Sequence, residues 1–369
     1  MMKLGLGLYR HMLDAEHYRF ARQCGCTDLV VHLVDYFKGA PPDALHNQPT
    51  GGNTGWGFAG DPNRLWSLEE LQNLRAQVED EGLCLAAIEN FDPAHWHDIL
   101  LDGPQKAAQL EGIQTLIRRV GEAGIGCIGY NFSLAGVAAR ITGPLARGGA
   151  MSVGTDGGDD TPIPNGMIWN MVYDADAPAG TVASIGYDEL WRRLEGFLDA
   201  VLPVAEAAGV TLALHPDDPP FPTLRDTPRL VYQPALYQKL IDLNSSRANK
   251  LEFCVGTLAE MTEGDVYESV EKYSAQGKIA YVHVRNVAGQ VPRYHETFID
   301  DGDVDMLRVL RILHQSGFEG VIIPDHTPQM SCAAPWHAGM AYALGWMKAA
   351  LTTIETESAQ SVAQSVKLS

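Results

Sequence analysis

The feature that most constrains the fold is an alternation of short apolar runs with longer amphipathic segments along almost the whole chain. This rhythm is typical of βα units built around a parallel sheet. Eight short runs read as strands: residues 4–8, 28–34, 84–90, 127–133, 211–217, 252–257, 279–286 and 320–326. Amphipathic segments between them read as helices: residues 67–81, 105–123, 187–208, 234–243, 266–276 and 304–315. Eight such units predict an α/β fold, the TIM (β/α)8 barrel, and 369 residues suit that barrel with insertions.

A doubly wound parallel sheet is the competing arrangement. That fold requires a glycine-rich phosphate turn after its first strand. Here the first predicted strand is followed by Tyr9-Arg10-His11-Met12, which contains no glycine. The barrel is therefore favoured.

Two segments are longer than ordinary loops. Residues 38–66 follow the second predicted strand, and residues 134–186 follow the fourth. Insertions of this length are usually lids or binding loops, with surface decoration as the alternative. Both follow a strand, so on a barrel they would overhang the face that carries active sites. We expect one barrel domain over residues 1–352 and a polar, frayed tail from Thr352 onward, over residues 353–369.

Composition excludes several classes of function. The chain has 27 Lys and Arg against 46 Asp and Glu, a formal net charge of −19 that repels nucleic acid and anionic membranes. No apolar run approaches the roughly 20 residues of a membrane-spanning helix. The first residues lack a signal-peptide pattern, and six scattered cysteines point to a reducing compartment. We expect a cytoplasmic protein without disulfides.

Four residues able to bind a metal end the last four predicted strands: His215, Cys254, His283 and Asp325. Each is separated from the next by about one βα unit, so a closed barrel brings all four to one rim. A strand-end histidine or a cysteine in a strand is, alone, more often structural. Four successive strands ending this way favour a shared site. Two imidazoles, a thiolate and a carboxylate suit Mn²⁺, Co²⁺ or Zn²⁺, and are too soft for Ca²⁺.

Several short motifs, in their order along the chain, resemble those of one known protein family. His-Pro-Asp-Asp-Pro-Pro at 215–220, Phe-Cys-x-Gly at 253–256, Asp-Gly-Asp-Val-Asp-Met at 301–306 and Pro-Asp-His at 324–326 resemble the mannonate dehydratase family of xylose-isomerase-like barrels. Tyr-Asn-Phe at 130–132 matches its fourth-strand motif. The resemblance implies a Mn²⁺-dependent hydro-lyase that converts D-mannonate to 2-keto-3-deoxy-D-gluconate in hexuronate breakdown, with Co²⁺, Fe²⁺ and Zn²⁺ as alternative ions.

Carried over by position, the resemblance implies His215, Cys254, His283 and Asp325 as metal ligands and His326 as the catalytic histidine. Two motifs depart from the family. Asp-His-Gly reads Asp325-His326-Thr327, and the final Gly-Tyr-Ser element reads Gly-Met-Ala-Tyr at 339–342. Tyr342 is therefore the candidate for the second proton carrier, with a packing aromatic as the alternative.

Dehydration of a sugar acid removes the C2 proton and expels the C3 hydroxyl, so negative charge builds on oxygen. A metal stabilises that charge, and protein side chains move the protons. Asp217 and Asp218 are candidates to orient His215. Candidate substrate-binding residues follow the strand ends: Glu89, Asn131, Arg285, Asn286, Arg293, His295 and Glu296. Among these we expect Arg285 to clamp the substrate carboxylate, whereas Arg293 and Glu296 equally fit a solvated loop.

Two rival functions remain open at this point. A sugar isomerase or epimerase on the same barrel also uses a proton next to a carbonyl, although the Cys254 thiolate argues against it. A non-catalytic binding protein would close its metal shell as structural zinc sites do. Only a small-molecule sugar acid is expected as partner. A homo-oligomer is compatible with the fold, but no segment identifies an interface.

Overall fold

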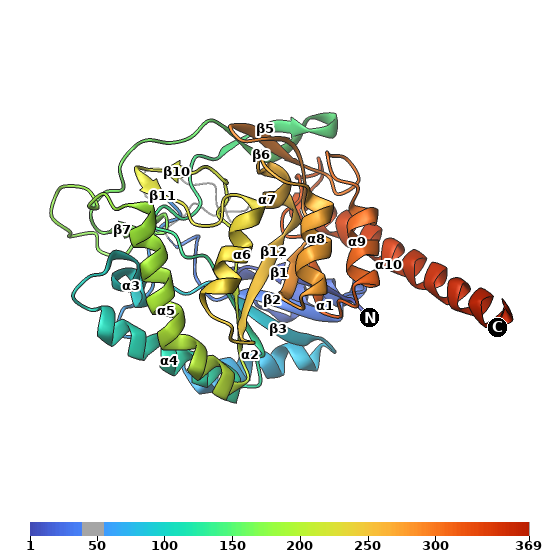
Figure 1. Cartoon of the computed structure of the whole chain (residues 1–369), viewed down its shortest axis with the longest axis horizontal. Helices are drawn as coiled ribbons and strands as arrows, with labels where there is room; N and C mark the ends of the chain where they lie inside the picture. The colour runs from blue at the N-terminus through green and yellow to red at the C-terminus, as the bar shows by residue number, and fades with distance from the viewer. Residues whose placement is uncertain (39–54, 369) are drawn as a thin grey trace.

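The computed structural model describes residues 1–38 and 55–368, with side chains through residue 360. Eight parallel strands close into a barrel in the order in which they occur in the chain, so the predicted TIM barrel is confirmed (Figure 1). The barrel strands are β1 Lys3–Leu8, β2 Asp28–His32, β3 Cys84–Glu89, β4 Cys127–Tyr130, β9 Thr211–Leu214, β12 Asn249–Cys254, β13 Ile279–His283 and β16 Val321–Ile323.

Helices cover the outside of the barrel and bury its apolar residues against their own apolar faces. They are α1 Ala15–Gln23, α2 Leu68–Asp80, α3 His97–Leu101, α4 Lys106–Glu122, α5 Tyr187–Ala208, α6 Pro234–Leu243, α7 Val255–Glu260, α8 Val266–Ala275, α9 Met306–Gln315 and α10 Pro335–Leu368, with short 3-10 turns at Arg10–Met12, Pro93–His95 and Arg147–Gly149. α2 begins with a capping box, in which Ser67 and Glu70 each accept the other's backbone N–H.

The inside of the barrel is polar just below its carboxyl end. Glu252 and Tyr281 point inward from neighbouring strands and lie opposite one another in the register of β12 and β13. A Cβ at Gly129 on β4 would overlap both Tyr281 Oη and Glu252 Oε2, so the glycine leaves the space that these two side chains fill. They form a rigid floor beneath the strand ends.

The long insertion after β4 adds strands outside the barrel, of which β7 and β8 pair with each other. It contains β5 Ile141–Ala146, β6 Ala150–Asp156, β7 Met167–Ile168 and β8 Met171–Val172. β6 pairs with a hairpin that follows β13, made of β14 Asn286–Gln290 and β15 Arg293–Thr297, and a four-stranded antiparallel sheet results. The residues after β13 were expected to form a loop, and that expectation is wrong. Their strand pairing depends on the distant insertion, which no local pattern reveals.

Several element ends differ from those expected. β4, β12 and β16 end three residues earlier than the predicted strands, and β12 passes directly into α7. A short hairpin, β10 Thr223–Leu224 with β11 Thr227–Pro228, follows β9. Part of the insertion at 38–66 lies outside the described residues.

The chain does not fray at Thr352, because α10 continues to Leu368 and projects away from the barrel (Figure 1). Residues 352–368 contain neither glycine nor proline, and this composition favours the continued helix. Among the described residues, no helix has the length and apolar character needed to cross a bilayer.

Candidate metal centre and active site

Three of the four predicted metal ligands converge at the carboxyl end of the barrel. Ligand atoms of His215, Cys254 and His283 all lie within 4.8 Å of one another. Cys254 and His283 are direct partners in the register of β12 and β13, and His215 follows the end of β9. The fourth, Asp325, follows β16 and places Oδ1 3.5 Å from His283 Nδ1. Parallel pairing thus gathers side chains that are far apart in sequence at one rim.

His215 is held in one orientation. Its Nδ1 lies 2.7 Å from the carbonyl oxygen of Pro216. Since a carbonyl only accepts, Nδ1 carries a hydrogen, and Nε2 is the nitrogen that a metal would bind after displacing its proton. Asp217 and Asp218, which were expected to orient this ring, instead hold other groups. Asp217 accepts the backbone N–H groups of residues 230 and 231 and pairs with Arg229.

Cys254 is a thiolate in this environment. Burial alone raises the pKa of a thiol, but the Arg285 guanidinium and the neighbouring imidazoles of His215 and His283 outweigh it and lower the pKa of Cys254 to about 5. The backbone N–H of Thr257 also donates to the sulfur, at 3.4 Å. Burial lowers the pKa of His215, yet the bond to Cys254 outweighs this effect and raises it to about 9. The site therefore holds a negative sulfur ready for a cation.

Two buried glutamates lie beneath His283. His283 Nε2 is 3.3 Å from Glu252 Oε1 and 3.5 Å from Glu89 Oε2, and these three side chains form a second group with metal-ligand spacing. Burial and the charge of Glu89 raise the pKa of Glu252 well above its usual value. Burial also opposes ionisation of Glu89, but His32 and His283 outweigh it and lower its pKa to about 2. One glutamate of the pair is therefore charged and the other neutral.

The donor set fits a divalent transition ion. Both ring nitrogens of His283 and one oxygen of Glu89 are buried without a hydrogen-bond partner among the described residues. Buried polar atoms are normally satisfied, and a bound cation satisfies the ring nitrogen that faces it. Imidazole, thiolate and carboxylate together suit Mn²⁺, Co²⁺, Fe²⁺ or Zn²⁺.

Arg285 lies behind these ligands instead of facing the substrate pocket. The side chain is 1% exposed, and its Nη2 donates to Asp218, Glu260 and Thr257 at 2.9–3.0 Å. Its Nη1 donates to Glu296 at 2.9 Å. Protein acceptors thus engage both ends of the guanidinium, which differs from the expected clamp on a substrate carboxylate. The structure gives it a different task, to stabilise the Cys254 thiolate.

His326 is backed by a buried carboxylate. Its Nδ1 lies 3.2 Å from Glu296 Oε1, and its Nε2 lies 3.4 Å from Asp325 Oδ1. Glu296 is 1% exposed and also accepts from Arg285. Burial would raise the pKa of Glu296, but His326 and Arg285 outweigh it and lower the pKa, so the group is ionised. A carboxylate that holds one ring nitrogen orients the imidazole for proton transfer at the other.

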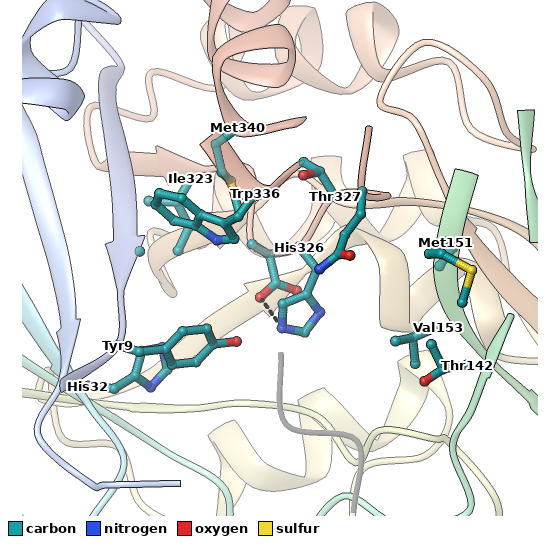
Figure 2. Close-up of a pocket in the computed structure, with 14 residues that line it drawn as sticks. Tyr9, His32, Thr142, Met151, Val153, Ile323, His326, Thr327, Trp336 and Met340 are labelled. Carbon is teal, nitrogen blue, oxygen red and sulfur yellow. Dashed lines mark ion pairs between the residues drawn. The ribbon is translucent and has the colours of Figure 1, made fainter. Parts of the chain in front are cut away.

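His215, His283, Asp325 and His326 line a pocket with two adjoining parts, whereas Cys254, Glu252, Arg285 and Glu296 lie behind its wall. The inner part, a cavity of about 60 Å³, is lined by Glu89, Asn131, His215, His283 and Arg140. The outer part has about 130 Å³ and opens between the insertion sheet and α10. Figure 2 shows Trp336 and Met340 on one wall of the outer part, Thr142, Met151 and Val153 on the opposite wall, and His326 between them. Tyr9, Asp325 and His326 line both parts.

Comparison with known proteins identifies the family. The D-mannonate dehydratase family model matches residues 27–142 and 180–354. The chain belongs to the D-mannonate dehydratase family. The mannonate dehydratase of Streptococcus suis (strain 05ZYH33) is 32% identical over 279 residues, which cover 71% of this chain and 75% of that protein. Mannonate dehydratase 2 of Halalkalibacterium halodurans is 30% identical, with 71% and 79% covered.

Solved structures agree with this family assignment. The crystal structure of mannonate dehydratase from Streptococcus suis serotype 2 matches with a TM-score of 0.76 and 26% identity, covering 97% of this chain and 95% of that one. L-ribulose 3-epimerase matches with a TM-score of 0.56 at 16% identity, and this likeness shows the barrel fold alone. As a member of the D-mannonate dehydratase family, the protein is a hydro-lyase that acts on a sugar acid.

Not every predicted site residue lies at the dehydratase pocket. Tyr342 is 36% exposed and donates to Asp300 at 2.7 Å, on the outer surface. Arg293 is exposed and pairs with Asp156 of the insertion sheet. His295 lies in β15 opposite Gly154, and it lines neither part of the pocket in the described chain. These side chains stabilise the sheet or the surface around the site.

Two predicted residues hold backbone segments in place. Asn286 donates to the carbonyls of Ile299 and Val304 and so holds the segment before α9. Asn131 donates to the carbonyls of residues 215 and 216 at 3.2 and 3.3 Å and accepts from Trp169. Its amide therefore fixes the backbone that carries His215.

Sequence reasoning missed several polar residues of the pocket, among them Tyr9, His32 and Arg140. Tyr9 directly follows β1, so the strand-end rule that found His215 also applies to it. Arg140 comes from the insertion and is buried against Asp218 at 3.0 Å. No pattern around Arg140 distinguishes it from a surface arginine, and only the folded insertion brings it to the site.

Proposed function

We propose that this dehydratase converts D-mannonate, or a closely related aldonate, to the 2-keto-3-deoxy acid and water. The observation that carries the proposal is the convergence of His215, Cys254 and His283 beside a histidine backed by Glu296. Relatives named as mannonate dehydratases share the family and support the choice of substrate.

We propose Mn²⁺ as the working ion, with Co²⁺, Fe²⁺ and Zn²⁺ as alternatives. His215, Cys254, His283 and Asp325 would hold it, and when bound it would supply stabilisation of negative charge on the substrate oxygens. One soft thiolate among three harder donors does not by itself select one transition metal. The coordination geometry and the metal ions available in the cell would decide which ion binds.

In this proposal the chain itself moves the protons. His326 takes the C2 proton, and the carboxylates of Glu296 and Asp325 on either side of the ring stabilise the resulting imidazolium. The inner cavity is small, and Trp56, Trp169 and Tyr36 in its lining limit the space for water around the reacting carbons. A cytoplasmic location and a homo-oligomeric state remain predictions of the sequence.

A metal analysis of the purified protein tests the proposal together with turnover of aldonates. We expect bound transition metal in the wild type and loss of the ion in both Cys254→Ala and His215→Ala. Cys127→Ala is the matched control, since Cys127 is also buried in a barrel strand but lies outside the ligand group. Retention of a full equivalent of metal by both ligand variants would contradict the proposed site. Absence of a 2-keto-3-deoxy product from every aldonate, with Mn²⁺, Co²⁺, Fe²⁺ and Zn²⁺ each tried, would contradict the proposed reaction.

A further inference from the structure

Dehydration requires a proton donor for the departing hydroxyl as well as a base for the C2 proton. Tyr342 donates a hydrogen bond to Asp300 on the surface, and it lines neither part of the pocket in the described chain. We propose that Tyr9, at the carboxyl end of β1, is the acid that protonates the C3 hydroxyl as it leaves. This inference rests on the proposed dehydration and adds a catalytic residue to it.

The position of the Tyr9 ring is set by aromatic packing. Its centroid lies 5.0 Å from that of His32 and 5.4 Å from that of Phe37, which meets it edge-on at 77°. Tyr36 contacts the ring from a third side, at 6.1 Å and 87°. Such contacts restrict the ring to one orientation. In Figure 2 the hydroxyl end of Tyr9 points across the pocket toward His326.

The hydroxyl of Tyr9 is available to a ligand. Nearby tyrosine hydroxyls are engaged, because that of Tyr36 accepts from Asn90 at 2.9 Å and that of Tyr294 donates to Asp218 at 3.0 Å. Within residues 1–38 and 55–360, no hydrogen bond to the Tyr9 hydroxyl is formed, although the residue lines both parts of the pocket. The residue is only partly buried, so its hydroxyl can be reached from the pocket and can bind a substrate hydroxyl.

The surroundings keep Tyr9 protonated. Burial first, and then the negative charges of Asp325, Glu89 and Glu296, raise its pKa, and Arg140 opposes them only in part. At neutral pH the group is therefore a donor. His326 lies across the pocket and is held by Glu296, so its position suits a base. The two groups divide the acid and base tasks between opposite walls.

The proposed step balances. His326 takes the C2 proton reversibly and leaves an enediolate of the substrate; when the C3–O bond then breaks, that electron pair forms the C2–C3 double bond. Tyr9 gives its phenolic proton to the departing oxygen, so water leaves and a phenolate remains. The enol then becomes the ketone, as its hydroxyl proton returns to Tyr9 and C3 takes the proton held by His326. Both side chains recover their starting forms.

The test uses the Mn²⁺-loaded enzyme and D-mannonate, and compares Tyr9→Phe with Tyr342→Phe. We expect Tyr9→Phe to keep its metal and its KM within a few-fold while kcat falls about 10²–10⁴-fold, the usual contribution of a general acid. In D₂O, Tyr9→Phe should still place deuterium at C2 of unreacted mannonate, because His326 is intact. Tyr342→Phe should retain kcat within twofold.

A second substrate separates acid catalysis from a structural role. With 3-deoxy-3-fluoro-D-mannonate the leaving group is fluoride, which needs far less protonation than hydroxide, so Tyr9→Phe should recover to within tenfold of the wild type. A kcat on mannonate within threefold of the wild type would overturn the proposal. Loss of the metal, of C2 exchange or of the fluoride rescue would overturn it as well. A wild type without activity on any aldonate would instead overturn the proposed function, and the assignment of Tyr9 with it.

Discussion

Asp218 is the residue whose loss the structure predicts most sharply. Its carboxylate is 3% exposed and accepts from Arg140 and Arg285 at 3.0 and 2.9 Å and from Tyr294 at 3.0 Å. Asp218→Asn keeps the shape but removes the charge, and it turns one acceptor into a donor that faces other donors. Two buried guanidinium groups then lose a counter-charge.

The expected cost follows from burial. Removal of one partner from a buried ion pair costs about 3–5 kcal/mol, because the remaining charge stays desolvated. Unfolding entropy near 2.1 cal/mol/K per residue gives about 0.8 kcal/mol/K for a chain of 369 residues. The apparent melting temperature should therefore fall by about 4–6 °C.

Asp156→Asn is the matched control. Asp156 pairs with Arg293, but the two side chains are 64% and 77% exposed. An exposed pair contributes about 0–1 kcal/mol, so the melting temperature should move by about 1 °C or less. Melting followed by circular dichroism, at one heating rate and one metal concentration, compares the two variants. Equal shifts for both would refute the argument that burial makes the Asp218 network strong.

The pH dependence has a definite sign. Burial opposes ionisation of Asp218, but Arg285 and Arg140 outweigh it and hold its pKa below its usual value. A depressed pKa contributes stability that is present above the unfolded pKa, about 3.9, and that is lost as pH falls through the folded value. The difference between the wild type and Asp218→Asn should therefore shrink below about pH 4. A difference that grows in acid would show that the carboxylate is not ionised in the native state.

Two further predictions concern the metal support and a helix end. Glu89→Gln should weaken metal binding by about 10–100-fold in a chelator competition, because it removes the charged carboxylate beside His283. Glu252→Gln changes a neutral group and should alter the metal affinity less than threefold. Equal effects of the two variants would contradict the assignment of charge to Glu89. Ser67→Ala should cost about 1 kcal/mol, or about 1 °C in melting temperature, through loss of the α2 cap, while Ser184→Ala in an exposed loop should cost nothing measurable.

The strand pattern was sufficient to predict the barrel and the convergence of three candidate metal ligands. Short apolar runs spaced by one βα unit define strands that end on the same face, so the sequence alone places His215, Cys254 and His283 together. The structure confirms that placement, because the parallel register of a closed barrel leaves little freedom in where neighbouring strands end.

The tasks of the polar residues could not be predicted in the same way. Arg285 lies two residues beyond His283, and alternation along a strand places it near the site, but β13 ends at His283 and the chain turns before Arg285. Its contacts with Asp218, Glu260 and Glu296 join segments 67, 25 and 11 residues away. Such contacts depend on how elements pack, which local patterns do not record.

The amino-acid sequence by itself determined the barrel, its ligand-bearing rim and the family, because strand periodicity and motif order are local properties of the chain. Only the tertiary structure decided that the Tyr9 hydroxyl faces His326, that Arg285 is buried beside Cys254 and that the insertion lines one side of the pocket. Those arrangements depend on long-range packing and on the free-energy cost of burying charge. Both contributions exist only in the folded chain.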